Sequence, residues 1–81
     1  MKKYALFIKK SCPFCVDALE LLKEKELEYN IVDVDGNSLL AQQVKTTFSW
    51  NTFPIVLEEE NNLFKLVGGF SDLENVFTED D

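Results

Sequence analysis

Apolar and polar positions follow two different rhythms along this chain, one typical of strands and the other of helices. Short runs of apolar, β-branched and aromatic residues at 3–9, 29–34, 53–57 and 63–67 predict four strands. After the first run, apolar residues recur every three or four positions over residues 13–26, which is the spacing of an amphipathic helix. The chain therefore begins with a strand, a helix and a second strand.

Two more helices are predicted where a capping residue precedes helically spaced apolar positions. Ser38 can cap the second helix, and Ser71 or Asp72 can cap the third. Asn61 and Asn62 can adopt positive φ and join the last two strands in a hairpin. The order βαβαββα predicts an α/β fold, a four-stranded mixed sheet flanked by three helices that cover both of its faces. The apolar positions assigned to these helices are Leu39, Leu40 and Val44 in the second, and Leu73, Val76 and Phe77 in the third.

Residues 45–51 fit neither rhythm and are the hardest part of the chain to assign. Two large aromatic residues, Phe48 and Trp50, lie within them. Such side chains either fill a core or line a binding site. Both the core and a lip near the cysteines remain open for them, and we favour the core.

The composition argues against several classes of function. At 81 residues the chain fits one domain, residues 1–81. Its 15 acidic residues outnumber 8 basic ones, all lysine, and the net charge of −7 argues against nucleic-acid binding. No apolar stretch reaches the roughly 20 residues of a transmembrane helix, and the first is too short for a signal peptide. We expect a cytoplasmic protein that binds neither nucleic acid nor membrane.

Both cysteines lie in one C-P-F-C segment, where the first predicted strand gives way to the first helix. Pro13 has no amide hydrogen and fits the first helical position, so Cys12 falls at the N-cap. Free backbone N–H groups, the helix dipole and the nearby Lys9 and Lys10 all favour a thiolate there. Cys15 lies one turn further in and should be less exposed. We interpret Cys12 as the attacking thiol and Cys15 as the resolving thiol.

Three other interpretations of the cysteine pair are weaker. Two inert buried cysteines need no particular spacing, whereas Cys12 and Cys15 stand in a C-x-x-C pattern. A closed structural zinc site needs four ligands, but the chain has no histidine and no third cysteine, so we expect no metal. A static disulfide across so short a loop would constrain the unfolded chain little.

With these motifs in place, the chain resembles the glutaredoxins across nearly its whole length. The resemblance is carried by three segments in the expected order, C-P-F-C at 12–15, T-F-P at 52–54 and G-G-F-S-D at 68–72. It implies the thioredoxin fold with sheet order 2-1-3-4 and central first and third strands. It also implies a glutathione-dependent thiol–disulfide oxidoreductase with Cys12 as nucleophile and Cys15 as resolving thiol.

The resemblance further implies how glutathione binds. Pro54 matches the family's cis-proline, which would bring the backbone of Phe53 beside the nucleophile to pair with the cysteine of glutathione. Lys9 matches the lysine that meets the glycine carboxylate. Phe14 replaces the commoner tyrosine as an aromatic wall. The γ-glutamyl end would be held at the start of the last helix by Gly69, Ser71 and Asp72.

The chain also departs from the family pattern. Many relatives bind the glycine carboxylate with an arginine or a glutamine before the third strand, and this chain has no arginine. Gln42 or Gln43 could serve instead, but neither aligns securely.

Cofactor and partners follow from the same resemblance. We expect no tightly bound cofactor, glutathione as co-substrate, and a monomer that acts on disulfide-containing proteins, with ribonucleotide reductase as one acceptor by family analogy. Two alternatives stay open. One is a carrier in which two chains and two glutathiones bind an iron–sulfur cluster, and the other is a redoxin reduced by a thioredoxin reductase.

Overall fold

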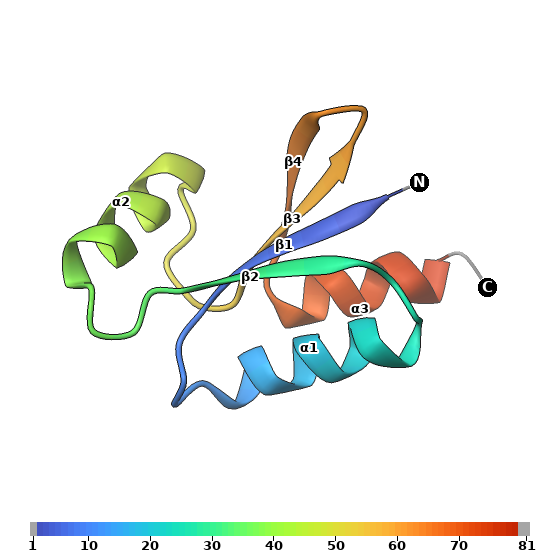
Figure 1. Cartoon of the computed structure of the whole chain (residues 1–81), viewed down its shortest axis with the longest axis horizontal. Helices are drawn as coiled ribbons and strands as arrows, with labels where there is room; N and C mark the ends of the chain where they lie inside the picture. The colour runs from blue at the N-terminus through green and yellow to red at the C-terminus, as the bar shows by residue number, and fades with distance from the viewer. Residues whose placement is uncertain (1, 80–81) are drawn as a thin grey trace.

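The computed structural model describes residues 2–79, in which four strands and three helices follow the predicted order (Figure 1). None of the described helices is long and apolar enough to cross a membrane. Most strand ends lie within one residue of the prediction, but the third strand begins at residue 55 rather than 53 and ends at 60 rather than 57. The elements are β1 (Lys3–Ile8), α1 (Pro13–Glu24), β2 (Tyr29–Asp33), α2 (Ser38–Phe48), β3 (Ile55–Glu60), β4 (Leu63–Gly68) and α3 (Phe70–Glu79).

The four strands form one mixed sheet in the order β2-β1-β3-β4. β1 pairs in parallel with β2 and antiparallel with β3, which pairs antiparallel with β4. Asn61 and Asn62 take positive φ values of 55° and 66° in the β3–β4 turn, as predicted. The predicted sheet order and the central position of the first and third strands are confirmed.

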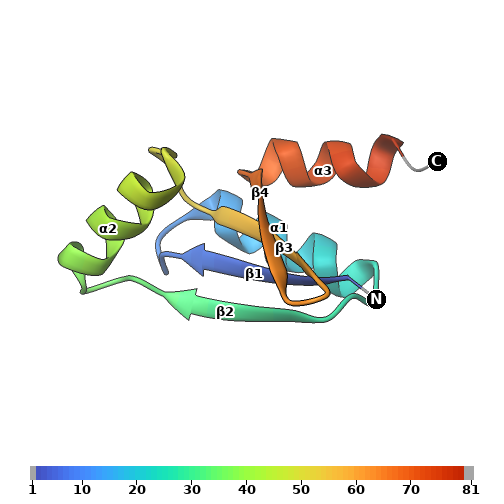
Figure 2. The same ribbon diagram turned by 90° about the horizontal axis from the view of Figure 1, so that it is seen from above.

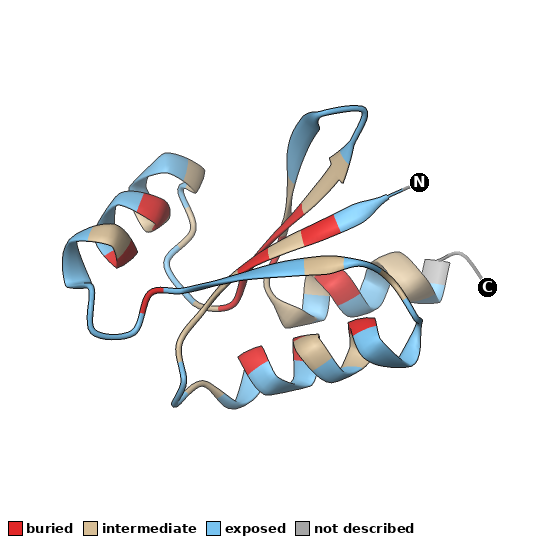
Figure 3. Cartoon of the chain, in the orientation of Figure 1, coloured by how far each residue is buried: buried red, intermediate tan, exposed pale blue. Residues whose placement is uncertain are grey.

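The main core lies between the sheet and the pair α1 and α3, which pack against each other (Figure 2). The buried parts of these two helices face the strands (Figure 3). Burying one large aliphatic side chain stabilises a fold by about 1.5–3 kcal/mol, so this layer supplies much of the stability. Its buried members are Tyr4, Leu6, Ala18, Leu22, Val56 and Leu73.

α2 lies on the opposite face, at one end of the sheet (Figure 1). Successive side chains of a strand point to opposite faces, so Phe7 points away from the core that contains Leu6. There its ring contacts Phe48 of α2, with ring centroids 6.1 Å apart. Phe48, the last residue of α2, is therefore half-buried between α2 and the sheet and does not belong to the buried cluster on the other face, although we favoured the core for it.

α1 ends at Glu24, two residues before the predicted end, because the chain closes it with a left-handed residue. Glu26 has φ 58°. Its N–H donates to the carbonyl of Lys23, and the N–H of Leu27 donates to the carbonyl of Leu22. These two bonds are the Schellman arrangement that ends many helices, and Leu27 then packs on the core.

The cap predicted for α2 is wrong by one residue. Asn37 is the N-cap, and its side-chain oxygen accepts a hydrogen bond of 3.0 Å from the N–H of Leu40. Ser38 is the first helical residue instead. Asparagine and serine cap helices about equally well, so propensity alone could not choose between neighbours.

Candidate active site

Cys12 lies at the N-cap of α1, where the sequence places it. Its backbone is extended, with φ −102° and ψ 108°, and Pro13 opens the helix. The N–H of Cys15 donates a 3.1 Å hydrogen bond to the Cys12 sulfur. This is the position at which a capping oxygen normally accepts such a bond. The sulfur thus faces a backbone donor at the positive end of the helix dipole, which stabilises negative charge on it.

The second contact of the Cys12 sulfur comes from the segment before β3. Its thiol donates to the backbone carbonyl of Phe53 over 3.4 Å. The Phe53–Pro54 peptide bond is cis, as the family resemblance implied. The structure therefore brings the backbone of Phe53 beside the Cys12 sulfur from 41 residues away along the chain.

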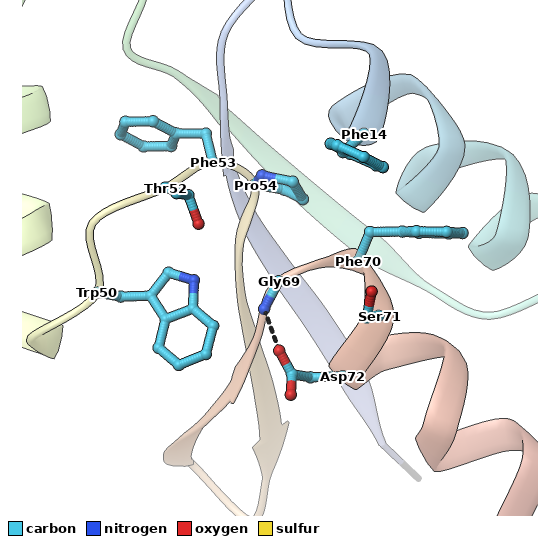
Figure 4. Close-up of a pocket in the computed structure, with 9 residues that line it drawn as sticks. All are labelled: Phe14, Trp50, Thr52, Phe53, Pro54, Gly69, Phe70, Ser71 and Asp72. Carbon is cyan, nitrogen blue, oxygen red and sulfur yellow. Dashed lines mark hydrogen bonds between the residues drawn. The ribbon is translucent and has the colours of Figure 1, made fainter.

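A groove lies next to this contact and encloses about 250 Å³ (Figure 4). Six of the seven residues predicted to bind glutathione line it, and Lys9 lies at the Phe53 ring beside it. The groove therefore brings together segments from α1, the α2–β3 connection and the start of α3. Its lining residues are Phe14, Trp50, Thr52, Phe53, Pro54, Gly69, Phe70, Ser71 and Asp72.

Two aromatic rings form one wall of the groove. Phe14 and Phe70 stack with centroids 6.3 Å apart and an angle of 24° between their planes. Phe14 is nevertheless 59% exposed, so one face of this aromatic wall is open to a ligand or a partner protein. The wall predicted for Phe14 is present, and Phe70 extends it.

The other end of the groove is the start of α3, where the predicted cap needs correction. Gly69 takes the capping place, because its carbonyl accepts the first helical hydrogen bond, from Leu73. Asp72 instead reaches back from the first turn, and its Oδ2 accepts a 2.9 Å bond from the N–H of Gly69. Ser71 is exposed in the same turn. A carboxylate side chain at the third helical position can accept a bond from the N–H of the capping residue, so Asp72 stabilises the start of α3 without being the cap itself.

Comparison with known proteins identifies the family. A sequence model described as Glutaredoxin matches residues 5–60. The chain belongs to the glutaredoxin family. Glutaredoxin-1 of Gallus gallus is 35% identical over 77 residues, which cover 91% of this chain and 72% of that protein. A probable glutaredoxin of Acanthamoeba polyphaga mimivirus is also 35% identical, covering 86% of this chain and 73% of that protein.

A solved relative supports the same fold. The solution structure of glutaredoxin from Brucella melitensis has a TM-score of 0.72 and 25% identity, covering 95% of this chain and 79% of that one. The thioredoxin fold is confirmed, and membership of the glutaredoxins makes the chain a thiol–disulfide oxidoreductase.

In this glutaredoxin, Trp50 is a groove residue whose position we predicted wrongly from the sequence. We expected it in the core, but it is half-buried and lines the groove on the side facing Gly69 and Asp72 (Figure 4). Its indole Nε1 is buried and has no hydrogen-bond partner among residues 2–79. The signal available in the sequence was its place four residues before Pro54, because the T-F-P motif approaches the Cys12 sulfur.

Lys45 is a second residue that the glutaredoxin motifs did not reveal. Its Nζ lies 5.5 Å from the centroid of the Phe53 ring, and Nζ of Lys9 lies 5.2 Å from the same centroid. Gln42 and Gln43, which we considered for the carboxylate, line a separate polar depression along α2. The region around Phe53 therefore carries two lysines and neither glutamine.

Cys15 is almost completely buried, with 1% of its surface exposed. This burial raises the pKa of the Cys15 thiol to about 12, and a hydrogen bond between the side chains of Cys15 and Cys12 contributes to the increase. Cys15 thus stays protonated at neutral pH. The pair consists of one accessible sulfur and one buried thiol, as the sequence predicted.

The buried thiol gives a testable pH dependence. In a Cys12→Ser variant, iodoacetamide should leave folded Cys15 unmodified up to about pH 10, since only a thiolate reacts. In guanidinium, labelling should begin near pH 8.5, the usual thiol pKa. The Cys15 thiol ionises at a lower pH in the unfolded chain than in the folded protein. The contribution of this buried thiol to the free energy of unfolding should therefore be complete below about pH 8.5 and be lost as the pH rises toward 12. Equal labelling of folded and unfolded protein at pH 9, followed by mass spectrometry, would contradict the assignment.

Proposed function

We propose that this protein is a glutathione-dependent oxidoreductase that reduces protein disulfides and glutathione mixed disulfides. The contact between the Cys12 sulfur and the Phe53 carbonyl is the observation that supports this most. It places a segment of backbone that lies just before β3, outside the sheet, beside the Cys12 sulfur and at the side of a groove of about 250 Å³. A peptide thiol that binds along this backbone like an added strand presents its own sulfur to Cys12.

The chemistry needs only thiols. The Cys12 thiolate attacks the glutathione sulfur of a mixed disulfide, forms a Cys12–glutathione disulfide and releases the protein thiolate, which takes a proton. A second glutathione thiolate then attacks the glutathione sulfur of this adduct, so that oxidised glutathione leaves and the Cys12 thiolate returns. For a protein disulfide, Cys15 attacks the Cys12 adduct, and two glutathiones later reduce the Cys12–Cys15 disulfide. A protein disulfide thus takes two electrons from two added glutathiones, whereas a mixed disulfide consumes one, because its own glutathione becomes the other half of the oxidised glutathione.

The groove supplies the binding contacts for this reaction. The N–H and carbonyl of Phe53 pair with the cysteine of glutathione, and Phe14 covers its side. Asp72, which also holds the N–H of Gly69, pairs with the γ-glutamyl ammonium, while the remaining N–H groups at the start of α3, around Ser71, take the adjacent carboxylate. Lys9 attracts the glycine carboxylate. We further propose a cytoplasmic monomer without a tightly bound cofactor, whose partners are disulfide-containing proteins such as ribonucleotide reductase.

The electron donor decides between this proposal and a redoxin reduced by a flavoprotein. Oxidised protein should be reduced by glutathione in an assay coupled to glutathione reductase and NADPH, and should then reduce a glutathionylated protein. Thioredoxin reductase with NADPH should reduce it at least about a hundredfold more slowly, because the glutathione contacts give that enzyme no advantage. The opposite order of rates would overturn the proposal. Visible absorbance and dimerisation after anaerobic reconstitution with iron and sulfide would indicate the cluster carrier instead.

A further inference from the structure

The end of the groove that α3 forms combines one carboxylate with one large aromatic ring. Asp72 is half-buried and is the only charged side chain among the described residues that line the groove. Trp50 lines the groove on the side facing Asp72 (Figure 4). Its Nε1 lies 3.7 Å, and Oδ2 of Asp72 lies 3.9 Å, from the position that a Cβ on Gly69 would take. The two side chains therefore flank the same small space over Gly69.

The part of Trp50 that borders this space consists of carbon. Nε1 is the only polar atom of the side chain, and it is closed off from solvent. The indole therefore presents its ring carbons to the groove. Among the aromatic side chains, tryptophan attracts cations most strongly, because its ring face carries negative charge. A carboxylate beside such a ring makes this end of the groove favourable for a positive charge.

A protein substrate has to bring this positive charge on a side chain. Glutathione carries an ammonium at the end that we propose to lie near Asp72, but a protein chain continues through the same place and has no ammonium there. A half-buried carboxylate without a partner is unfavourable, because burial removes part of its hydration. In the orientation proposed for glutathione, the residue before the substrate cysteine lies at this end. A lysine or arginine at that position can pair with Asp72 while its side-chain stem packs on the indole.

The other end of the groove disfavours the same charge. Nζ of Lys9 and Nζ of Lys45 lie 5.2 Å and 5.5 Å from the centroid of the Phe53 ring. In the same orientation, the residue after the substrate cysteine lies at this end, where a basic side chain would meet two ammonium groups of like charge. The two ends together favour a basic residue before the cysteine and disfavour one after it.

We propose that Trp50 and Asp72 form a cation site that selects protein substrates with a basic residue immediately before the reactive cysteine. This inference rests on the proposed function, from which it takes the direction of the bound chain. It makes Trp50 a residue that determines the choice of protein substrate. The net charge of −7 attracts any basic protein, whereas this site distinguishes between sequences of equal charge.

The test uses two blocked peptides of identical composition, with arginine immediately before or immediately after a single cysteine. Each peptide is supplied as a disulfide with thiopyridine. The Cys12 thiolate attacks the peptide sulfur, and thiopyridine leaves as its coloured thione, so that the second-order rate can be followed. After correction for the rates with mercaptoethanol, the wild type should favour the peptide with arginine first by roughly tenfold. Equal rates, or a preference for the reverse order, would overturn the inference.

Variants connect this preference to the two side chains. Trp50→Leu and Asp72→Asn should each lower the ratio of the two rates to about threefold or less. The amide oxygen of asparagine can still accept the bond from the N–H of Gly69, so the start of α3 is retained. Phe64→Leu makes a similar aromatic-to-leucine change on the exposed surface of β4 and should keep the full ratio. An unchanged ratio in Trp50→Leu would contradict the role of the indole.

Trp50 is the only tryptophan in the sequence, so its fluorescence reports on this site. In Cys15→Ser, the disulfide between Cys12 and either peptide persists, because the resolving thiol is absent. The emission of Trp50 should change when arginine precedes the peptide cysteine, and it should stay close to that of the peptide-free protein when arginine follows it. Equal spectra for the two adducts would contradict the cation site.

Failure of this inference and failure of the proposed function are distinguishable, because the peptides contain no glutathione. If the order of the peptide has no effect while glutathione mixed disulfides are turned over in the glutathione reductase assay, the cation site is wrong and the proposed function stands. If the order has the expected effect and that assay shows no turnover, the cation site is supported and glutathione is not the electron donor.

Discussion

Cys12→Ser should reduce the turnover of glutathione mixed disulfides by at least about a thousandfold, because a serine hydroxyl cannot form the disulfide intermediate. Loss of folding would not explain this result, since serine is among the best N-cap residues and can accept the same bond from the N–H of Cys15. The measurement is NADPH oxidation coupled through glutathione reductase, with circular dichroism as the check on folding.

Cys15→Ser is the matched variant, since it makes the same atomic change three residues away. It should retain reduction of glutathione mixed disulfides at a comparable rate, because free glutathione resolves the Cys12 adduct. Reduction of protein disulfides that require the second thiol should fall strongly. Activity that persists in Cys12→Ser and disappears in Cys15→Ser would reverse the roles assigned to the two sulfurs.

Gly68→Ala should lower stability by about 2–4 kcal/mol, the largest effect that we expect from adding a single methyl group. Gly68 has φ 127°, a conformation that residues with a side chain rarely adopt. A Cβ there would lie 2.5 Å from Oδ2 of Asp72. That oxygen is held by the N–H of Gly69, so it cannot move without breaking the bond at the start of α3. Thermal unfolding should show a drop of about 10–20 °C for a domain of this size.

Gly36→Ala separates backbone strain from the steric clash. Gly36 also has positive φ, 77°, but a Cβ there would meet no atom within 4 Å. Its substitution should cost only about 1 kcal/mol, the strain of a left-handed alanine. Only Gly68→Ala should also weaken glutathione binding, because only that change displaces Asp72. If the two variants were equally stable, the contact with Asp72 would not be the cause.

The fold could be predicted because most of its information is local. Strand and helix periodicities, the turn at Asn61 and Asn62, and the place of Cys12 before Pro13 each depend on neighbours in sequence. The cis-proline contact spans 41 residues, and the sequence supplied it only through the family resemblance. The observed helix ends and caps differ from the predicted ones by one or two residues, because neighbouring residues such as Asn37 and Ser38 are nearly equally good caps.

The positions of Trp50 and Lys45 could not be predicted from the sequence, for a common reason. Both lie at or just beyond the last turn of α2, where the direction of the chain depends on the left-handed Ser49, with φ 52°. A serine in this conformation has no distinctive sequence signature, since glycine or asparagine is the usual residue. An error of one residue at this point changes which side chains face the groove. Motif matching placed Phe53 and Pro54, but it did not place the side chains that approach them from α2.

The carbonyl oxygen of Phe53 has different partners before and after the reaction. While Cys12 carries its proton, this oxygen accepts the thiol hydrogen. When that sulfur enters a disulfide, the hydrogen is gone and the oxygen loses its donor, which is unfavourable for an acceptor that is only part-exposed. A backbone N–H of the newly attached peptide can then replace the lost donor. Covalent capture should therefore strengthen the hold on the bound partner, and release of the free thiol should weaken it.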